Sequence, residues 1–285
     1  MKDRQATRVF AVVSPSCTPA SGGDGETIRG MRVCRRSFAE VAALLTAWSG
    51  ERDRMRYFAC VNAHSAEVAH RDATFMAALQ QADLLVADGF GVILASRILG
   101  GGIRERATGP DLFMAVSEAL DRAGGRSVFY LGGSEDTLAR IRDRHEKRFP
   151  GLRIAGMHAP PFRTAFADEE MAAMVDRVND AKPDVLWIGL GAPKQEKWIL
   201  AARERLRVPL CGPVGAVFDY FAGNVAPPPR WVEKAGLHWA YRLIRNPRRL
   251  WRRNLDSPLF LARVLADRLR GDRGDAAASP PRSST

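Results

Sequence analysis

Small and polar residues stand directly after several short apolar runs of the sequence. Asn62-Ala63-His64 follows one run, Asp88-Gly89 a second, Gly132-Gly133-Ser134 a third and Gly189-Leu190-Gly191-Ala192-Pro193 a fourth. Glycine-rich turns between a strand and a helix expose the first amides of the helix, and such amides suit a phosphate group. Tight-turn geometry alone explains one such turn, but three on successive strand ends favour a nucleotide or sugar-nucleotide site.

Several common nucleotide-binding motifs are absent from the sequence. It has no GxxxxGK[ST] phosphate loop, and Gly89-Phe90-Gly91 lacks the third glycine of a dinucleotide fingerprint. No Asp-x-Asp pair is present to bind a divalent cation. We therefore expect a bound diphosphate to be neutralised by arginine, lysine and backbone amides, with no metal and no other cofactor.

Nucleophilic and zinc chemistry are not indicated either. None of the five histidines stands with a serine or cysteine in a nucleophile motif, and we expect His64 to be structural. The four cysteines are scattered, without a CxxC pair or a Cys/His cluster. This usage is typical of a reducing cytosol.

Strand and helix patterns alternate along most of the chain, which predicts an α/β fold with a mostly parallel Rossmann-like sheet and helices on both faces. The expected strands are Tyr57–Val61, Leu84–Ala87, Val128–Leu131, Arg153–Ala155, Val185–Leu190 and Val208–Cys211. The expected helices are Phe38–Trp48, Glu67–Gln81, Val92–Leu99, Leu112–Ala123, Glu135–Phe149, Glu169–Asn179 and Gln195–Leu206. Ser134 and Asp168 are expected to cap helices, and Pro110 to open one. Ligands of such folds bind at the carboxyl ends of the strands, where the polar residues above stand.

The composition describes a core-forming chain with disordered ends. It has 285 residues, of which 46% are hydrophobic and 26% charged, so the chain as a whole is not disordered. No apolar run is long enough to span a membrane, and Val9–Val13 is too short for a secretory signal, so we expect no export. Residues 1–30 and 271–285 are rich in small and turn-forming residues and are predicted to be disordered, leaving an α/β domain over residues 31–225.

The C-terminal segment carries most of the net charge of +11. Residues 230–270 contain 11 lysines and arginines against 3 acidic residues, interleaved with tryptophans and leucines. Helices of this composition lie in membrane interfaces, where each basic residue near an anionic leaflet adds about 1 kcal/mol. Residues 226–270 are therefore predicted to be a basic amphipathic helical appendage that associates with a membrane; the alternative is that the aromatic residues pack as core. No nucleic-acid motif accompanies the charge, so we expect no nucleic-acid partner.

Four segments together resemble a known family. They are Val61–Phe113, Tyr130–Arg142, Ile188–Ile199 with the motif GAPKQEKW, and Val214–Arg253. In order and spacing they are similar to the WecG/TagA/CpsF glycosyltransferases, over roughly Arg32 to Arg253. The resemblance implies a metal-independent, inverting hexosyltransferase that moves a sugar from a UDP-sugar to a polyprenyl-diphosphate-linked sugar in bacterial surface polysaccharide synthesis. Donors in the family include N-acetylmannosamine, its uronic acid and other hexoses.

The same resemblance implies a cytoplasmic enzyme attached peripherally to the inner face of the membrane. It does not indicate an oligomeric state. A second hypothesis is a non-catalytic nucleotide-binding protein that uses its basic tail to bind membrane or nucleic acid. Transfer to a lipid-linked sugar distinguishes the two, because only the enzyme turns substrate over.

Three catalytic positions follow from the resemblance. Asp88 matches the proposed catalytic carboxylate, and as a base it would take the proton of the acceptor hydroxyl. Its alternative role is to cap the helix that follows. Asn62 would bind substrate hydroxyls or orient Asp88, and its alternative is a turn residue. Gln195 would contact the sugar or the base.

The remaining implied residues bind substrate. Arg106 would contact a phosphate, and Asp219 would accept ribose hydroxyls unless it caps a helix. Gly132, Gly133, Gly191 and Lys194 would lie at the nucleotide, whereas Lys197 is expected on a solvated helix face. Arg242, Arg249 and Arg252 would fold over the site and bind the diphosphate.

The sequence departs from the family pattern at three places. Cys60 replaces a hydroxyl residue, Pro227 lies where an Arg-Ala-Pro sequence is usual, and His238 replaces a glutamate. Because a thiol is a weak donor, a direct hydrogen bond from position 60 is in doubt.

Overall fold

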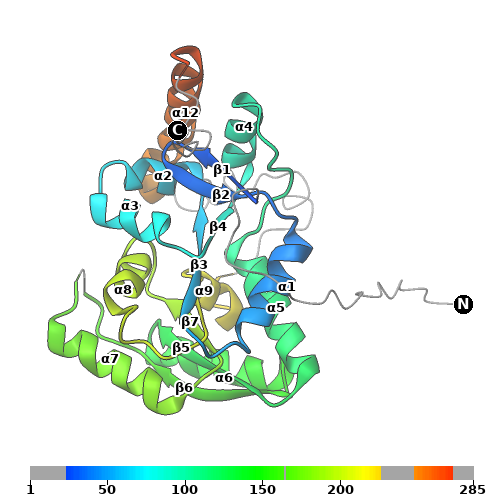
Figure 1. The fold of residues 1–285 in the computed structure, drawn as a ribbon. Coiled ribbons are helices and arrows are strands. Elements are labelled where there is room, and N and C mark those ends of the chain that lie inside the picture. The colour runs from blue at the N-terminus through cyan, green and yellow to red at the C-terminus, as the bar shows by residue number, and fades with distance from the viewer. Residues whose placement is uncertain (1–23, 164, 226–246, 272–285) are drawn as a thin grey trace, which may run out of the picture.

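A six-stranded sheet forms the centre of the protein. The computed structural model describes residues 24–163, 165–225 and 247–271, with the backbone alone for 247–255 (Figure 1). The strand order is β4-β3-β8-β7-β5-β6, and all neighbours pair in parallel. The strands are β3 (Arg56–Val61), β4 (Leu84–Ala87), β5 (Arg126–Gly132), β6 (Leu152–His158), β7 (Val185–Gly189) and β8 (Leu210–Pro213). The predicted α/β class with a parallel sheet is confirmed.

Helices cover both faces of this sheet, as predicted. Neighbouring strand residues point to opposite faces, so Phe58 packs with helices on one side and Tyr57 with helices on the other. The first side holds α1 (Phe38–Trp48), α5 (Gly109–Ala123), α6 (Glu135–Arg148) and α9 (Val217–Ala222). The second holds α2 (Ala63–Ala69), α3 (Ala73–Gln80), α4 (Phe90–Ile98), α7 (Asp168–Ala181) and α8 (Lys194–Ala202).

The core is packed around Trp187 of β7, which is fully buried. Its ring makes edge contacts with Phe58 at 6.5 Å and with Phe113 of α5 at 5.1 Å between ring centres. Gly212 of β8 leaves the room for this indole, because a Cβ atom there would lie 2.3 Å from it. Aromatic contacts of this kind add to the burial of large apolar surfaces, so the strands form a rigid platform for the residues at their ends.

The single helix predicted over Glu67–Gln81 is two helices in the structure. α2 ends at Ala69, and Asp72 caps α3 by accepting the backbone N–H of Phe75 at 3.1 Å. An aspartate at this position starts a new helix more readily than it continues an old one. Ser134 is confirmed as the N-cap of α6, whereas Ala167, not Asp168, is the N-cap of α7.

A hairpin begins inside the segment that was expected to be disordered up to residue 30. β1 (Gly25–Ile28) pairs antiparallel with β2 (Met31–Cys34) through a turn at Arg29 and Gly30, which both have positive φ. Ile28, Met31 and Val33 are buried against the α2/α3/α4 side of the core. The small and turn-forming residues of this region mask the alternating apolar residues that form the hairpin.

The C-terminal helix α12 (Pro247–Leu269) docks beside α2 and α4 and projects past them (Figure 1). Phe260 and Val264 are fully buried in this contact; burying a side chain such as Phe260 stabilises by about 2 kcal/mol. Glu67 of α2, itself fully buried, forms ion pairs with Arg263 and Arg71. Among the described residues, no helix is both long and apolar enough to cross a membrane.

Candidate active site

Asn62 and Asp88 meet at the carboxyl ends of two paired strands. β3 and β4 run in register with Val61 opposite Ala87, and the Asp88 backbone N–H donates to Val61 O at 2.8 Å. This pairing places the next two side chains together, and the Asn62 Nδ2 donates to Asp88 Oδ2 at 3.3 Å. Both residues are partly exposed, so the carboxylate stands at the surface of the sheet edge with one oxygen held by an amide.

Of these two residues, Asn62 caps a helix and Asp88 does not. Gly89, with a φ of +116°, is the N-cap of α4, so Asp88 stands one residue before the capping position. Asn62 does cap α2, since its Oδ1 accepts the Ser65 N–H at 3.0 Å. The amide group of Asn62 therefore anchors a helix with its oxygen and orients Asp88 with its nitrogen.

Gln195 lies buried at the start of α8, after β7. Its Oε1 accepts the Gly191 N–H at 3.2 Å, and its Nε2 donates to Glu196 Oε1 at 2.9 Å. A Cβ atom on Gly215, in the turn after β8, would lie 3.3 Å from the same Oε1. The amide thus fixes the turn after β7 and lies beside the turn after β8, rather than projecting freely into solvent.

The predicted phosphate-binding glycines have different surroundings. Gly132 ends β5 with a φ of +122°, and a Cβ atom there would lie 2.6 Å from the carbonyl carbon of Gly189. Gly133 has a φ of +72°, and a Cβ atom there would lie 3.3 Å from the Thr137 side chain. A Cβ atom on Gly191 would meet no atom within 4 Å, but the Gly191 N–H already donates to Gln195. Close approach of β5 and β7 therefore requires Gly132 independently of any ligand.

Asp219 stands in the first turn of α9 and is exposed. The helix N-cap is Ala216, so the predicted alternative of Asp219 as a cap is wrong. Asn224 bridges it to the start of α6, donating from Nδ2 to Asp219 Oδ1 at 3.3 Å and to Thr137 Oγ1 at 3.0 Å. Asp219 is thereby held near the turn of Gly133.

The predicted residues therefore follow one edge of the sheet. Asp88 and Asn62 follow β4 and β3, Asp219 follows β8, Gln195 follows β7, and Gly133 follows β5. Three strand spacings separate β3 from β5, which corresponds to about 14 Å. A carboxylate–amide pair at one end and glycine turns with a second carboxylate at the other form an elongated site.

Comparison with known proteins identifies the family. The glycosyl transferase WecG/TagA/CpsF family matches residues 26–274, which is most of the chain. The chain belongs to this family.

Curated relatives carry the name N-acetylglucosaminyldiphosphoundecaprenol N-acetyl-beta-D-mannosaminyltransferase. The one from Bacillus spizizenii is 32% identical over 197 residues, covering 69% of this chain and 74% of the relative. Those from Bacillus subtilis and Staphylococcus aureus MW2 are 28% and 27% identical, covering 73% and 67% of this chain and 78% and 72% of the relatives. The predicted family and the prediction of a hexosyltransferase are confirmed.

Arg106 of this WecG/TagA/CpsF protein lies near the Asn62–Asp88 pair. The Ala107 N–H donates to Ala87 O at 2.9 Å, so the segment before α5 runs along the end of β4. The Arg106 guanidinium lies over the ring of Phe90, 5.5 Å from its centre. This contact holds a cation close to the turn that contains Asp88.

Lys194 points away from that pair. Its Nζ donates to Arg163 O at 2.8 Å and lies over Phe162 and Phe166, in the loop between β6 and α7. Burial lowers the pKa of its ammonium group. Lys197 was expected on a solvated face, but it forms an ion pair with Asp72 and joins α8 to α3.

Cys60, which departs from the family pattern, lies on β3 beneath the site. Burial raises the pKa of its thiol well above the usual value, and the Asp88 and Glu196 carboxylates add to the increase. A protonated thiol there is a weak donor, as the sequence indicated. Cys60 thus lies within electrostatic reach of two carboxyl groups.

His64, two residues after Asn62, connects α2 to α12. Its Nδ1 lies 2.6 Å from Asp256 Oδ2, and Arg71 Nη2 donates to the other oxygen of Asp256 at 3.1 Å. The expectation that His64 is structural is consistent with this contact. Asp256 contacts α2 near Asn62. Arg249 and Arg252 belong to the turns of α12 that come just before Asp256. Their side chains are not described.

Other predicted parts lie outside the described residues. These are the tail arginine Arg242 and the two other departures from the family pattern, Pro227 and His238.

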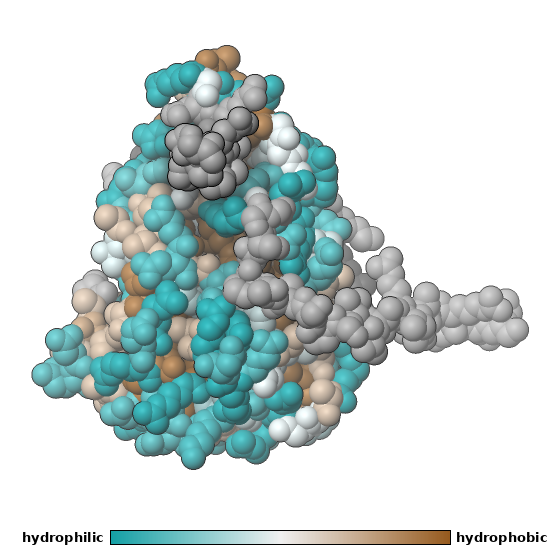
Figure 2. All heavy atoms as spheres, viewed as in Figure 1, coloured by the Kyte–Doolittle hydropathy of each residue, from teal (hydrophilic) through white to brown (hydrophobic). Residues whose placement is uncertain are grey.

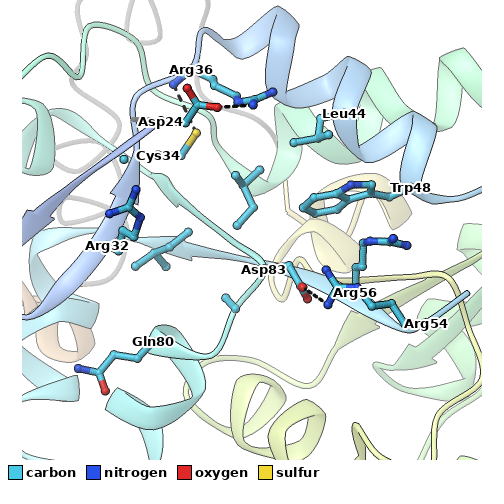
Figure 3. A pocket seen from close by; sticks show the side chains of 14 residues that line it. Asp24, Arg32, Cys34, Arg36, Leu44, Trp48, Arg54, Arg56, Gln80 and Asp83 are labelled. Atoms are coloured by element: carbon cyan, nitrogen blue, oxygen red, sulfur yellow. Dashed lines mark hydrogen bonds and ion pairs between the residues drawn. The ribbon is translucent and has the colours of Figure 1, made fainter. Parts of the chain in front are cut away.

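A cavity of about 130 Å³ lies at the opposite end of the sheet (Figure 3). It is bordered by the first residues of β3 and β4, by Trp48, and by arginines whose charges are largely compensated. Arg54 pairs with Asp83 at 2.7 Å, and Arg36 pairs with Asp24. Ligands of parallel sheets bind at carboxyl ends, so this cavity is separate from the candidate active site.

Proposed function

We propose that this glycosyltransferase moves an N-acetylmannosamine-type sugar from a UDP-sugar to a polyprenyl-diphosphate-linked sugar in the synthesis of a bacterial surface polysaccharide. Relatives that match two thirds or more of the chain are named for a mannosaminyl transfer to a diphosphoundecaprenol-linked sugar. The observation that carries the proposal is the Asn62–Asp88 contact at the carboxyl edge of the sheet.

In the proposed reaction Asp88 is the general base. It takes the proton of the acceptor hydroxyl while that oxygen attacks the anomeric carbon, and the bond from this carbon to the diphosphate oxygen breaks on the opposite face. The configuration at the anomeric carbon is inverted, and UDP leaves with the bonding electron pair. Asn62 donates to one oxygen of Asp88 and so helps to orient the carboxylate.

Arginines and backbone amides neutralise the departing diphosphate. Arg106 lies beside the turn of Asp88, and Arg249 and Arg252 lie on the turns of α12 that precede its contact with His64. Guanidinium groups bind phosphate oxygens in pairs. At the other end of the edge, Gly133 and Asp219 are placed for the nucleoside, with the Asp219 carboxylate accepting ribose hydroxyls.

The donor is tested by screening UDP-N-acetylmannosamine, its uronic acid and UDP-N-acetylglucosamine against a short polyprenyl-diphosphate-linked N-acetylglucosamine. Transfer from one mannosamine-type donor, at the same rate with and without EDTA, is expected. A rate abolished by the chelator would overturn metal independence. Binding of UDP without transfer from any donor would favour the non-catalytic hypothesis instead.

Attachment to an anionic membrane surface is part of the proposal. Leu259, Leu265 and Leu269 are exposed on α12, opposite the buried Phe260 and Val264. Figure 2 shows apolar surface at the tip of this projecting helix. On α4, Phe90 and Leu94 are also exposed on one stripe. These side chains would enter the headgroup region while the basic residues of the tail contact the lipid phosphates.

Replacing both Leu265 and Leu269 with serine should release the protein from vesicles that contain phosphatidylglycerol. Each substitution removes part of the roughly 2 kcal/mol that burying a leucine side chain contributes. The membrane partition coefficient measured by vesicle flotation should therefore fall at least about tenfold. Phe162→Ser is the matched control, because Phe162 is fully exposed beside β6, at the far edge of the sheet. Unchanged flotation of the double variant would contradict this membrane contact.

A further inference from the structure

Glu196 is a buried carboxyl group that the mechanism above does not use. It lies in the first turn of α8 with only 3% of its surface exposed. Its Oε1 accepts from Gln195 Nε2 at 2.9 Å, whereas its Oε2 is buried without a hydrogen-bond partner among the described residues. A buried carboxyl with an unpaired oxygen is costly, so the position requires an explanation other than stability.

Neither lysine of α8 compensates this carboxyl. Lys194 Nζ donates to the backbone of Arg163, and Lys197 pairs with Asp72, the residue that caps α3. The titratable groups that face Glu196 from β3 are Tyr57 and Cys60, and Glu196 contributes to raising the pKa of both.

Asp88, at the end of β4, shares Cys60 as a neighbour, since its charge also raises the pKa of that thiol. The carboxyl of Glu196 therefore lies below the same edge of the sheet that carries the catalytic pair.

Gln195 is held at both ends of its amide. Its oxygen accepts the Gly191 N–H, and its nitrogen donates to Glu196. In the flipped orientation the NH₂ group would face the Gly191 N–H and the amide oxygen would face Glu196 Oε1, so that two donors would meet at one end and two acceptors at the other. The glutamate thus selects the orientation in which Gln195 supports the turn after β7.

We propose that Glu196 is a positioning residue of this glycosyltransferase, which fixes the Gln195 carboxamide and through it the Gly191 turn at the floor of the site. The inference deepens the proposed function and rests on it for its kinetic readout. Groups that orient a functional side chain from behind commonly change activity by about 10- to 100-fold when they are removed.

The same position makes the protein sensitive to pH near neutrality. Burial, opposed by the hydrogen bond from Gln195, raises the pKa of Glu196 to about 7 from 4.5. Because the pKa is raised in the folded state, the stability that this group contributes is complete below about pH 4.5 and is lost as the pH rises through about 7. The ionised group also adds a negative charge on the side of Cys60 and Asp88.

The test compares Glu196→Ala and Glu196→Gln with the full-length parent between pH 5 and 8.5. Glu196→Ala should lower kcat about 10- to 100-fold at every pH. Glu196→Gln keeps an acceptor for Gln195, so its kcat should fall less, and its midpoint of thermal unfolding should gain on the parent as the pH rises from 5 to about 7 and then stay level. Glu204→Gln is the matched control, because the Glu204 side chain is 90% exposed, and it should follow the parent in both readouts.

The possible failures are distinguishable. If Glu196→Ala lowers the unfolding midpoint but leaves kcat and KM at parental values, the residue is merely structural and the inference is overturned. If the parent transfers no sugar, the proposed function fails, yet the unfolding midpoints remain measurable. A Glu196→Gln variant whose midpoint parallels that of the parent at every pH would then refute the buried titrating carboxyl on which the inference stands.

Discussion

Replacing Asp88 with asparagine should lower kcat by about 10²- to 10⁴-fold with little change in KM for the donor. The amide has the same shape as the carboxylate but cannot take the proton of the acceptor hydroxyl. Asn62 already donates to Asp88 Oδ2, and the amide oxygen of the variant can accept the same bond. The fold should therefore survive the change, and initial rates under saturating donor and acceptor measure the effect.

The matched control is Asp136→Asn. Asp136 is an exposed aspartate in the first turn of α6, with its side chain 72% exposed and paired with Arg140. Its amide variant should keep the parental rate, since it lies far along the edge from β4 and contacts no predicted catalytic residue. Near-normal turnover by a folded Asp88→Asn protein would show that another group accepts the proton.

The contact that carries this prediction follows from local sequence rules. Apolar runs predicted β3 and β4, and the residue after each run is polar. Once the two strands pair in parallel, the backbone bond from Asp88 to Val61 leaves the Asn62 and Asp88 side chains adjacent. For this pair, the sequence was sufficient, because both positions are set by strand ends. The pairing of the individual atoms, Nδ2 with Oδ2, depends on side-chain orientation that the sequence does not specify.

Glu196 shows where such reasoning failed. In a charged stretch such as KQEK, a glutamate at the start of a helix is normally solvated. The packing of α8 against α3 and β8 instead turns Gln195 and Glu196 inward. Burial of this kind depends on which face of a helix the sheet occupies, and a short helix with mixed polarity does not specify its face.

Gly132 is another residue whose surroundings the sequence does not predict. Its replacement gives the second large expected effect, a loss of folding stability. From the sequence, its place in a glycine-rich turn suggested room for a phosphate. In the structure, a Cβ atom would lie 2.6 Å from the carbonyl carbon and 2.7 Å from the oxygen of Gly189, and φ is +122°. Backbone atoms of a neighbouring strand cannot move aside as a side chain can.

Gly132→Ala should therefore destabilise the protein by about 4 kcal/mol, combining overpacking with a strained backbone. In a protein of this size, that loss lowers the midpoint of thermal unfolding by about 10 °C. Gly191→Ala provides the comparison, because its φ of +79° is strained but nothing lies within 4 Å of its Cβ position, so it should cost only about 1 kcal/mol. If Gly132→Ala were as stable as Gly191→Ala and only raised KM for the donor, ligand approach and not the β5–β7 contact would be the reason for a glycine at this position.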